Sequence, residues 1–282
     1  MRTVRIILPI LLVITLIGLS ALPGHAAPML NTPGSTNLVA WWKLDEASGS
    51  RADSHGAYTL TDNNTVGSTT GKFNNAASFI RANSEYLSGS NISTPGGITV
   101  GGWVRATALD GTIQTIASQW NTGSNARKWG LRIGTTNKFD FVISSDGQNN
   151  GATQYVVTST VNLSTNTWYF VAGVFTANTV SVYVNGTLTS AAASASIYNG
   201  GSANVLLGAF TTSALFFGGD LDEVFFYNRA LSTDELDWLY NSGTGRTYTE
   251  TVATATPTVT NTITATPTNT LTPTDTPTIT PT

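Results

Sequence analysis

Three carboxylates fall within four positions of the segment GGDLDEVFFYNRALSTDEL, residues 218 to 236. Asp220, Asp222 and Glu223 stand directly before a run of apolar and aromatic residues. Such a cluster could supply the paired acids of a hydrolase, bind a metal ion through its oxygens, or form the rim of a strand. The elements that position the three side chains decide which of these roles applies.

The composition allows one good-sized hydrophobic core and argues against nucleic-acid binding. Of the 282 residues, 40% are hydrophobic and 10% are charged, and the formal net charge is -3. A nucleic-acid surface needs clustered Lys and Arg, and no basic run follows the first few positions. We therefore expect no nucleic acid among the partners. The chain has no Cys, which excludes disulfides.

The N-terminus has the pattern of a secretory signal peptide. Arg2 and Arg5 precede the apolar run from residue 6 to residue 22, and the small-residue stretch PGHAAP predicts cleavage after Ala26. A retained membrane anchor is the alternative, but the run is short for a span and contains a proline and a glycine. We expect a secreted or cell-surface protein with no membrane insertion after cleavage.

The C-terminal segment is a low-complexity tail. From residue 254 to residue 282 every second residue is Thr, and prolines recur among them. The prolines remove hydrogen-bond donors and favour extended conformations, which predicts a disordered, semi-rigid spacer. The predicted organisation is a signal peptide over residues 1–26, a linker over residues 27–34, a folded domain over residues 35–248 and a Thr/Pro-rich spacer over residues 249–282.

In the predicted folded domain, short β-type segments alternate with turn clusters, as in an all-β sandwich. The alternation is clearest at Val180, Val182 and Val184, which share one apolar face. Asn185 and Gly186 then predict a hairpin turn, because both tolerate positive φ. Strands are expected over residues 98–106, 128–134, 138–145, 167–175, 179–186 and 204–210.

One short helix is predicted near the end of this domain. Ser232 and Glu235 form a capping box, and Leu236 and Leu239 give an apolar stripe. Gly243 is expected to end the helix in a left-handed conformation. A helix this short needs tertiary burial, so we expect it to pack on the sandwich.

Several motifs carry a resemblance to a known family. They are LVAWWKLDEASGSRADSHGAYTLT, GKFNNAASFIRANSEYLS, ITVGGWV, TWYFVAGVFTANTVSVYVNGTL and the closing GGDLDEVFFYNRALSTDEL. In this order they resemble the laminin-G-like jelly-roll domains of the concanavalin A-like lectin and glucanase superfamily. Asn74 and Asn75 replace a glycine of many relatives, which affects one turn. The resemblance implies a two-sheet antiparallel jelly-roll sandwich with one short C-terminal helix.

The closing acids lack the spacing of a glucanase. An enzyme of that branch would carry two glutamates on one strand, and alternate residues of a strand share a face. Retaining hydrolases hold their two carboxyl groups about 5 Å apart. Here Asp220 and Asp222 share a face that Val224 and Phe226 continue, while Glu223 points the other way. We therefore expect no catalytic residues, and we take Asp220 and Glu223 as rim residues.

Calcium is the metal that the resemblance implies. Members of the family often hold calcium between an early D-x-x-G loop and the closing D-E strand, which nominates Asp53 and Asp222 as ligands with a backbone oxygen near Gly56. The alternative is that Asp53 caps a turn and Asp222 accepts backbone hydrogen bonds. His55 is the only His left after signal removal, so neither a zinc site nor a Ser/His/Asp triad is identifiable.

Two polar loops, NTGSNARK and SSDGQNNGATQY, hold candidate carbohydrate contacts. Aromatic rings stack on sugars, while Asn, Asp and Arg side chains bind hydroxyls. Trp120 has equal claims to ligand contact and to packing, whereas Trp129, Trp103 and Trp168 are expected to pack in the sandwich. The candidate ligand-binding residues are Trp120, Asn121, Asn125, Arg127, Asp146, Asn149 and Tyr155.

These patterns favour an exported, non-catalytic module that binds extracellular carbohydrate and is displayed on a Thr/Pro spacer. One alternative is a structural or adhesive domain that binds a cell-surface protein. The other is a polysaccharide-active glycoside hydrolase on the same fold. Loss of glycan binding in a folded Trp120→Ala variant would favour the first, and hydrolysis abolished by Asp222→Asn would favour the last.

Overall fold

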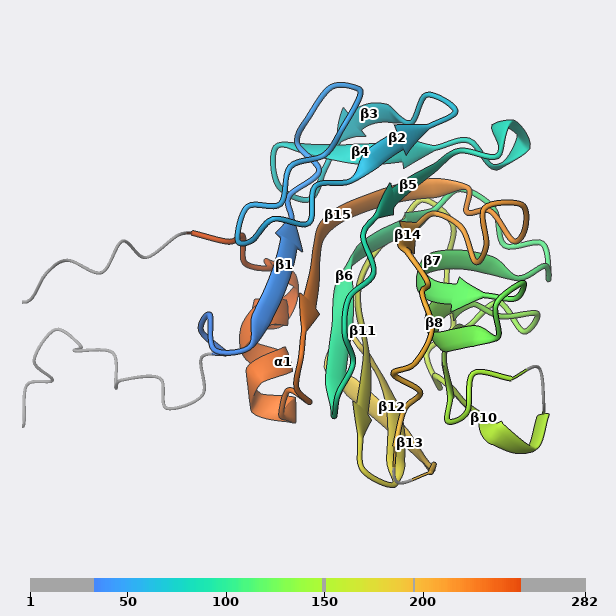
Figure 1. The fold of residues 1–282 in the computed structure, drawn as a ribbon. Helices are drawn as coiled ribbons and strands as arrows, with labels where there is room; N and C mark the ends of the chain where they lie inside the picture. The colour runs from blue at the N-terminus through green and yellow to red at the C-terminus, as the bar shows by residue number, and fades with distance from the viewer. Residues whose placement is uncertain (1–32, 149–150, 195, 250–282) are drawn as a thin grey trace, which may run out of the picture. The chain divides into compact units, whose positions relative to one another are not determined.

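The computed structural model describes residues 33–148, 151–194 and 196–249. Within these residues the chain forms two antiparallel sheets that enclose a hydrophobic core (Figure 1). The predicted all-β sandwich is therefore confirmed. The predicted signal peptide, most of the linker and nearly all of the spacer lie outside the described residues.

Eight of the described strands form the first sheet. Its long members β6 (Ile98–Ala106) and β11 (Trp168–Thr176) are the segments that β-branched and aromatic residues mark in the sequence. Strand β1 (Leu38–Trp42) pairs with the second half of β15 (Gly219–Tyr227). The order across the sheet is β13 (Thr187–Ala192), β12 (Thr179–Val184), β11 (Trp168–Thr176), β6 (Ile98–Ala106), β15 (Gly219–Tyr227), β4 (Asn75–Phe79) and β3 (Gly67–Thr70).

Seven of the described strands form the second sheet. Short 3-10 turns at Arg81–Asn83, Gly151–Thr153 and Asn241–Gly243 lie between the strands or after the last helix. The order across the second sheet is β10 (Gln154–Thr158), β9 (Phe139–Ser144), β8 (Ala126–Ile133), β7 (Gln114–Asn121), β14 (Val205–Leu207), β5 (Tyr86–Gly89) and β2 (Thr61–Asn63).

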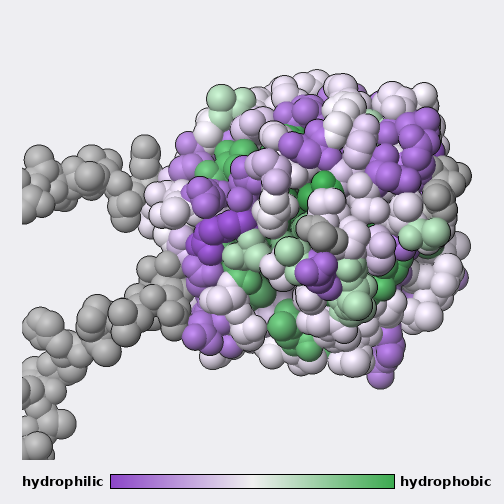
Figure 2. Space-filling view, turned by 60° about the horizontal axis from the view of Figure 1, so that its bottom comes forward, coloured by the Kyte–Doolittle hydropathy of each residue, from purple (hydrophilic) through white to green (hydrophobic). Residues whose placement is uncertain are grey.

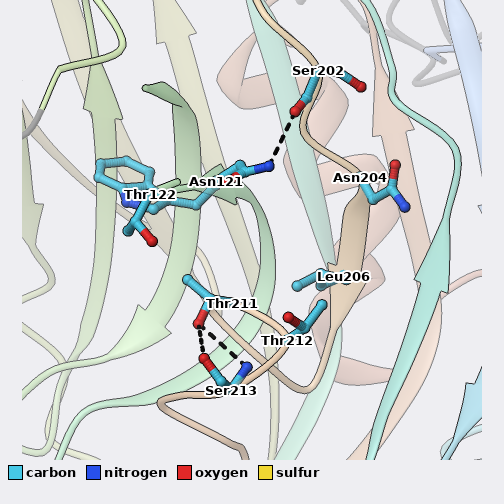
Figure 3. A pocket seen from close by; sticks show the side chains of 9 residues that line it. Asn121, Thr122, Ser202, Asn204, Leu206, Thr211, Thr212 and Ser213 are labelled. Carbon is cyan, nitrogen blue, oxygen red and sulfur yellow. Dashed lines mark hydrogen bonds between the residues drawn. The ribbon is translucent and has the colours of Figure 1, made fainter. Parts of the chain in front are cut away.

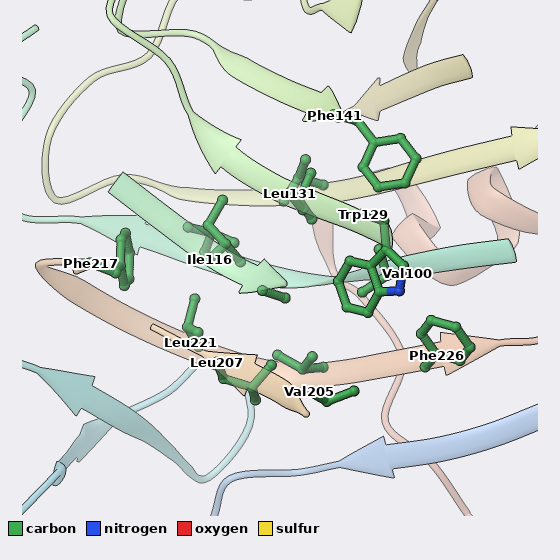
Figure 4. Packing of buried hydrophobic residues seen from close by; sticks show 14 of the residues in the cluster. Val100, Ile116, Trp129, Leu131, Phe141, Val205, Leu207, Phe217, Leu221 and Phe226 are labelled. Carbon is green, nitrogen blue, oxygen red and sulfur yellow. The ribbon is translucent and has the colours of Figure 1, made fainter. Parts of the chain in front are cut away.

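The main core lies between the two sheets. Figure 4 shows Trp129 and Phe141 of the second sheet in the same cluster as Val100 and Phe226 of the first. Trp129 is fully buried, and its indole N–H donates to Gln119 at 3.1 Å. The expectation that Trp129 packs in the sandwich is confirmed.

The predicted β12–β13 hairpin is also confirmed. Val180, Val182 and Val184 all belong to the main core. Asn185 and Gly186 have φ values of 46° and 92°, so both turn residues are left-handed as the Asn-Gly pair allows.

A second apolar cluster covers the outer face of the first sheet. Helix α1 (Thr233–Tyr240) packs there through Leu236 and Leu239, against Trp103 and Phe170 among others. Trp103 is buried but lies in this outer cluster, and Trp168 packs at its margin while partly exposed. The prediction that these two tryptophans fill the space between the sheets was therefore wrong. Trp103 in β6 and Trp168 in β11 both lie on the face of the first sheet that helix α1 covers.

The capping box of α1 is present as predicted. The Ser232 hydroxyl accepts from the Glu235 backbone N–H, and the Glu235 carboxylate accepts from the Ser232 N–H at 2.8 Å. The helix ends two residues earlier than Gly243 would place it. Asn241, with φ of 48°, takes the left-handed position after Tyr240. Asparagine tolerates this conformation better than most residues, which explains the earlier end.

Candidate functional site

A β-bulge changes the face on which the closing acids stand. Pairing of β15 with β6 shifts register between Asp222 and Phe225, and Glu223 has a positive φ of 49°. Beyond the bulge Val224 and Phe226 point into the main core. The prediction that they continue the face of Asp222 was wrong, because one extra residue breaks the strict alternation.

Asp220 is buried and paired, not a rim residue. Its Oδ2 accepts from Nε of Arg105 at 2.8 Å, and only 4% of the residue is exposed. The guanidinium of Arg105 also lies over the ring of Trp168, 4.8 Å from its centroid. Asp220 and Arg105 are opposite each other in neighbouring strands, so the pair is set by sheet register.

Glu223 is buried as well, so its prediction as a rim residue was wrong. Only 1% of it is exposed, and burial raises the pKa of its carboxyl above the ordinary range. The carboxylate accepts hydrogen bonds from the Trp41 indole, the Thr247 hydroxyl and, at 3.4 Å, the Tyr248 backbone N–H. These bonds tie the end of the folded domain to β15.

Asp222 holds the turn between β3 and β4. Its Oδ2 accepts from the backbone N–H groups of Lys72 and Phe73 at 2.7 and 2.8 Å. A Cβ at Gly71 would lie 2.6 Å from that oxygen, so glycine lets the backbone wrap around the carboxylate. The residue is fully buried, and burial raises the pKa of Asp222 to about 8. Its other oxygen, Oδ1, is buried without a partner among the described residues.

Asp53 and Gly56 lie together in a different loop. Asp53 Oδ1 accepts from the backbone N–H groups of Trp41 and His55, each at 2.9 Å, and Oδ2 accepts from Tyr58 at 3.0 Å. A Cβ at Gly56 would lie 2.9 Å from that Oδ2. Asp53 thus performs the turn-capping role that the sequence left open.

The fit of these residues to calcium is uneven. Both oxygens of Asp53 already accept backbone hydrogen bonds. The unpartnered buried oxygen of Asp222, by contrast, is an oxygen donor of the kind that calcium takes. Throughout the described ranges, no group of three or more His, Cys, Asp or Glu side chains is placed to hold a metal ion. A site at Asp222 would therefore depend on backbone carbonyl oxygens.

A separate polar pocket opens where β7 ends beside both flanks of β14 (Figure 3). We call it the Trp120 pocket, and its volume is about 290 Å³. Leu206 is a buried apolar member of its wall, and the other members are polar apart from one indole. The pocket is lined by Trp120, Asn121, Thr122, Ser202, Asn204, Leu206, Thr211, Thr212 and Ser213.

The indole of Trp120 forms an aromatic wall of this pocket. Its ring packs on Phe210 in a tilted arrangement, with centroids 4.8 Å apart and an interplanar angle of 32°, which fixes its orientation. Trp120 is 5% exposed, so packing and pocket lining coexist in the same side chain. A β-bulge lies between Gln119 and Trp120. Gln119 accepts a hydrogen bond from the core residue Trp129, whereas Trp120 lines the pocket.

Asn121 fastens the rim of the pocket. Its Oδ1 accepts from the backbone N–H groups of Gly123 and Ser124, and its Nδ2 donates to the Ser202 carbonyl at 3.3 Å. Figure 3 shows this last bond crossing from the β7 side to the segment before β14. Asn121 lines the pocket, but its amide group is already hydrogen-bonded to backbone groups of the rim.

Asn125 and Arg127 stabilise the β7–β8 loop and do not line the Trp120 pocket. Arg127 is 4% exposed and donates at 3.0 Å to Asn125 Oδ1 and to the Gly147 carbonyl. It also donates to the Thr122 carbonyl at 3.3 Å. Arg127 therefore holds the backbone of the pocket residue Thr122, and Asn125 holds Arg127.

The remaining candidates of the second polar loop do not line the pocket either. Asp146 Oδ1 accepts from the Gln148 backbone and from the Thr153 hydroxyl, each at 2.8 Å, and the Gln148 bond lowers the pKa of this carboxyl. Tyr155 packs against the main core while partly exposed. Asn149 lies outside the described residues.

Most of the pocket lining comes from residues that sequence reasoning missed. β14 pairs with β7 across a long stretch of chain, which brings its flanking loops to Trp120. The available signal was the density of small polar residues around the short apolar run VLL. The missed residues are Thr122, Ser202, Asn204, Leu206, Thr211, Thr212 and Ser213.

Two packed antiparallel sheets with a single short covering helix in the described ranges define a jelly-roll sandwich. The family model described as the Concanavalin A-like lectin/glucanases superfamily, of laminin-G type, matches residues 80–237. The chain belongs to this family. No curated protein sequence matches it.

Solved structures share the fold at low sequence identity. One is domain 4 of AbnA, a GH43 extracellular arabinanase from Geobacillus stearothermophilus, in complex with arabinotriose. It is 18% identical with a TM-score of 0.53, and the match covers 74% of this chain and 98% of that one. The binding domain of Botulinum Neurotoxin DC in complex with SialylT is 12% identical with a TM-score of 0.57, covering 74% of this chain.

The same toxin domain in complex with rat synaptotagmin II is 11% identical with a TM-score of 0.56, covering 73% of this chain. The match spans about half of the toxin chains, 52% and 51% respectively. The two toxin structures are of a binding domain, and the arabinanase domain was solved in complex with arabinotriose. No helix in the described part of the chain is long and apolar enough to cross a membrane.

Proposed function

We propose that this protein is an exported, non-catalytic module that binds extracellular carbohydrate in the Trp120 pocket. The observation that carries the proposal is a set of uncommitted polar groups beside an oriented indole. Among the described residues, no hydrogen-bond partner is present for the Trp120 indole N–H or for the side chains of Thr122, Ser202, Asn204 and Thr212. An aromatic wall with neighbouring donors and acceptors suits a sugar ring.

The structural neighbours support a binding role of this general kind. One was solved with arabinotriose, one with SialylT and one with synaptotagmin II. Glycans and proteins are thus both partners of domains with this fold. The pocket chemistry favours the glycan, because its uncommitted groups are hydroxyls, an amide and an indole N–H.

The state of the closing acids supports a non-enzymatic role. A hydrolase needs an acid and a second carboxylate facing a substrate cleft. Asp220 is paired with Arg105, Asp222 holds a backbone turn, and Glu223 is buried under the end of the domain. None of the three lines the Trp120 pocket.

The protein-binding alternative would be favoured by a continuous apolar surface. Figure 2 shows one face on which hydrophobic side chains form scattered patches among polar ones. In the described residues the large exposed hydrophobic side chains are Ile80, Val156, Leu188 and Leu215. We therefore place the adhesive role second.

Export and display complete the proposal. The signal pattern of residues 1–26 would direct secretion, and the Thr/Pro-rich residues 249–282 would act as a spacer that holds the domain away from its attachment.

A Trp120→Ala variant is expected to lose glycan binding. Tryptophans at the centre of a binding site commonly contribute about 2 kcal/mol or more, so affinity should fall about thirtyfold. The measurement is titration calorimetry with a glycan selected on an array, with circular dichroism to confirm folding. Trp168→Ala is the matched control, because it removes a partly exposed tryptophan of the other sheet. Unchanged affinity in a folded Trp120→Ala variant would refute this site.

We further propose that calcium binds at Asp222. The ion would neutralise the buried carboxylate and stabilise the turn that begins at Gly71. Calcium at 100 times its Kd would raise the free energy of unfolding by about 2.7 kcal/mol, so thermal melts should shift upward in CaCl₂ relative to EGTA. Asp222→Asn should remove the shift and Asp146→Asn, in another loop, should keep it. An equal melting temperature of the wild-type protein in CaCl₂ and in EGTA would contradict the proposal.

A further inference from the structure

The lining of the Trp120 pocket carries no charge. Its nine residues are one tryptophan, one leucine, two asparagines, three threonines and two serines. The side chains that have uncommitted hydrogen-bonding groups are exposed at Thr122, Ser202, Asn204 and Thr212. Each of these groups can pair with a hydroxyl, and none supplies a counter-ion.

The arginines behind the pocket wall are already engaged. Arg127 is buried and gives its terminal nitrogens to Asn125 and to backbone carbonyls. Arg132 lies over the ring of Phe210, 5.9 Å from its centroid, and pairs with Asp140 at 3.7 Å. Neither guanidinium lines the pocket.

This arrangement discriminates by charge. A carboxylate or sulfate that enters the pocket would lose part of its hydration and gain no cation, and removing an unpaired charge from water is unfavourable. A neutral sugar exchanges water for hydroxyl and amide partners at little net cost. The volume of about 290 Å³ is also at the low end for ligand pockets, which favours a short glycan segment.

We infer that the Trp120 pocket is selective for uncharged sugar residues and rejects sugars that carry a carboxylate or sulfate. The inference rests on the proposed function, since it names the class of glycan that the same pocket takes. The selectivity follows from what surrounds the ligand, namely five uncommitted neutral groups and two arginines held elsewhere.

The test compares matched neutral and acidic sugars on the full folded protein. The neutral probes are arabinotriose, xylotriose, cellotriose, galactotriose and lactose. Two of them have an acidic counterpart, which is trigalacturonate for galactotriose and 3′-sialyllactose for lactose. Each probe is titrated by calorimetry. Wild-type protein should bind at least one neutral probe, and the acidic member of a bound pair should bind about tenfold more weakly or worse.

Charge variants locate the selectivity in the pocket. Thr212 is exposed, so Thr212→Lys and the neutral control Thr212→Gln should both fold. The lysine should strengthen binding of the acidic probes about tenfold, whereas the glutamine should not. The selectivity would be overturned if acidic probes bound the wild-type protein as tightly as neutral ones. If Thr122→Val then weakened binding of both kinds of probe, the proposed function would still stand. Failure of every probe would overturn both.

Discussion

In a buffer that contains a chelator, the free energy of unfolding is expected to fall by several kcal/mol as the pH rises from about 4 to about 8. Asp222 is fully buried, and burial raises its pKa to about 8. The unfolded chain releases this proton near pH 3.9, at about the ordinary aspartate pKa. Between the two values the folded state holds a proton that the unfolded state has lost. The stabilisation is therefore complete below about pH 4 and is lost as the pH approaches 8.

The size of the effect follows from the shift. Each pKa unit corresponds to about 1.4 kcal/mol, so about four units correspond to about 5 kcal/mol at most. The neighbouring carboxyls of Glu223 and Asp45 act in the same direction on Asp222, since negative charges disfavour a further ionisation. Burial also raises the pKa of Glu223, which adds to the slope with the same sign.

Urea unfolding followed by tryptophan fluorescence at pH 5, 6, 7 and 8 measures this profile. Asp222→Asn is the matched variant, because an amide oxygen can still accept from Lys72 and Phe73 while the titrating group is gone. Its profile should be flatter than that of wild type. A wild-type stability that is constant or rises between pH 5 and pH 8 would contradict the assignment.

Replacing Gly173 by alanine is expected to lower the free energy of unfolding by about 3 kcal/mol. A Cβ at Gly173 in β11 would lie 2.2 Å from Cδ2 of Phe141 in β9. Phe141 is fully buried in the main core, so its ring cannot move aside without displacing other packed side chains. The two sheets would have to separate locally.

Chemical denaturation measures the loss, and two further variants identify its cause. Gly96→Ala is the control, because no atom lies within 4 Å of the added methyl group. It should change the stability by no more than about 0.5 kcal/mol. Phe141→Leu should reduce the cost of Gly173→Ala by making room, which a double-mutant cycle detects. If Gly173→Ala and Gly96→Ala lowered the free energy of unfolding equally, the contact with Phe141 would not be the cause of the loss.

Local chemistry predicted much of the fold. The β-branched and aromatic content of residues 98–106 gave β6 with its observed ends, and the Asn185–Gly186 pair gave the β12–β13 turn. The capping box at Ser232 gave the start of α1. In each case the information lies within a few consecutive residues, where propensity and side-chain capping act.

The candidate site depended on contacts that local patterns do not contain. At the bulge, the Glu223 carboxylate accepts hydrogen bonds from two residues distant in sequence, Trp41 and Thr247, and strict alternation could not reveal this arrangement. Trp120 and Asn121 could be named from their own loop. The other wall of the pocket comes from the flanks of β14, which reaches β7 through long-range pairing.

The bonds between Glu223 and the segment Thr247–Tyr248 also have a mechanical meaning. Tension applied to the chain beyond Tyr248 would first load these bonds and thereby pull on β15, before it could unwind helix α1. β15 is paired with β6, β4 and β1, so the load would be divided among three neighbouring strands. Force applied at the C-terminal end of the domain would thus reach a central strand of the first sheet directly.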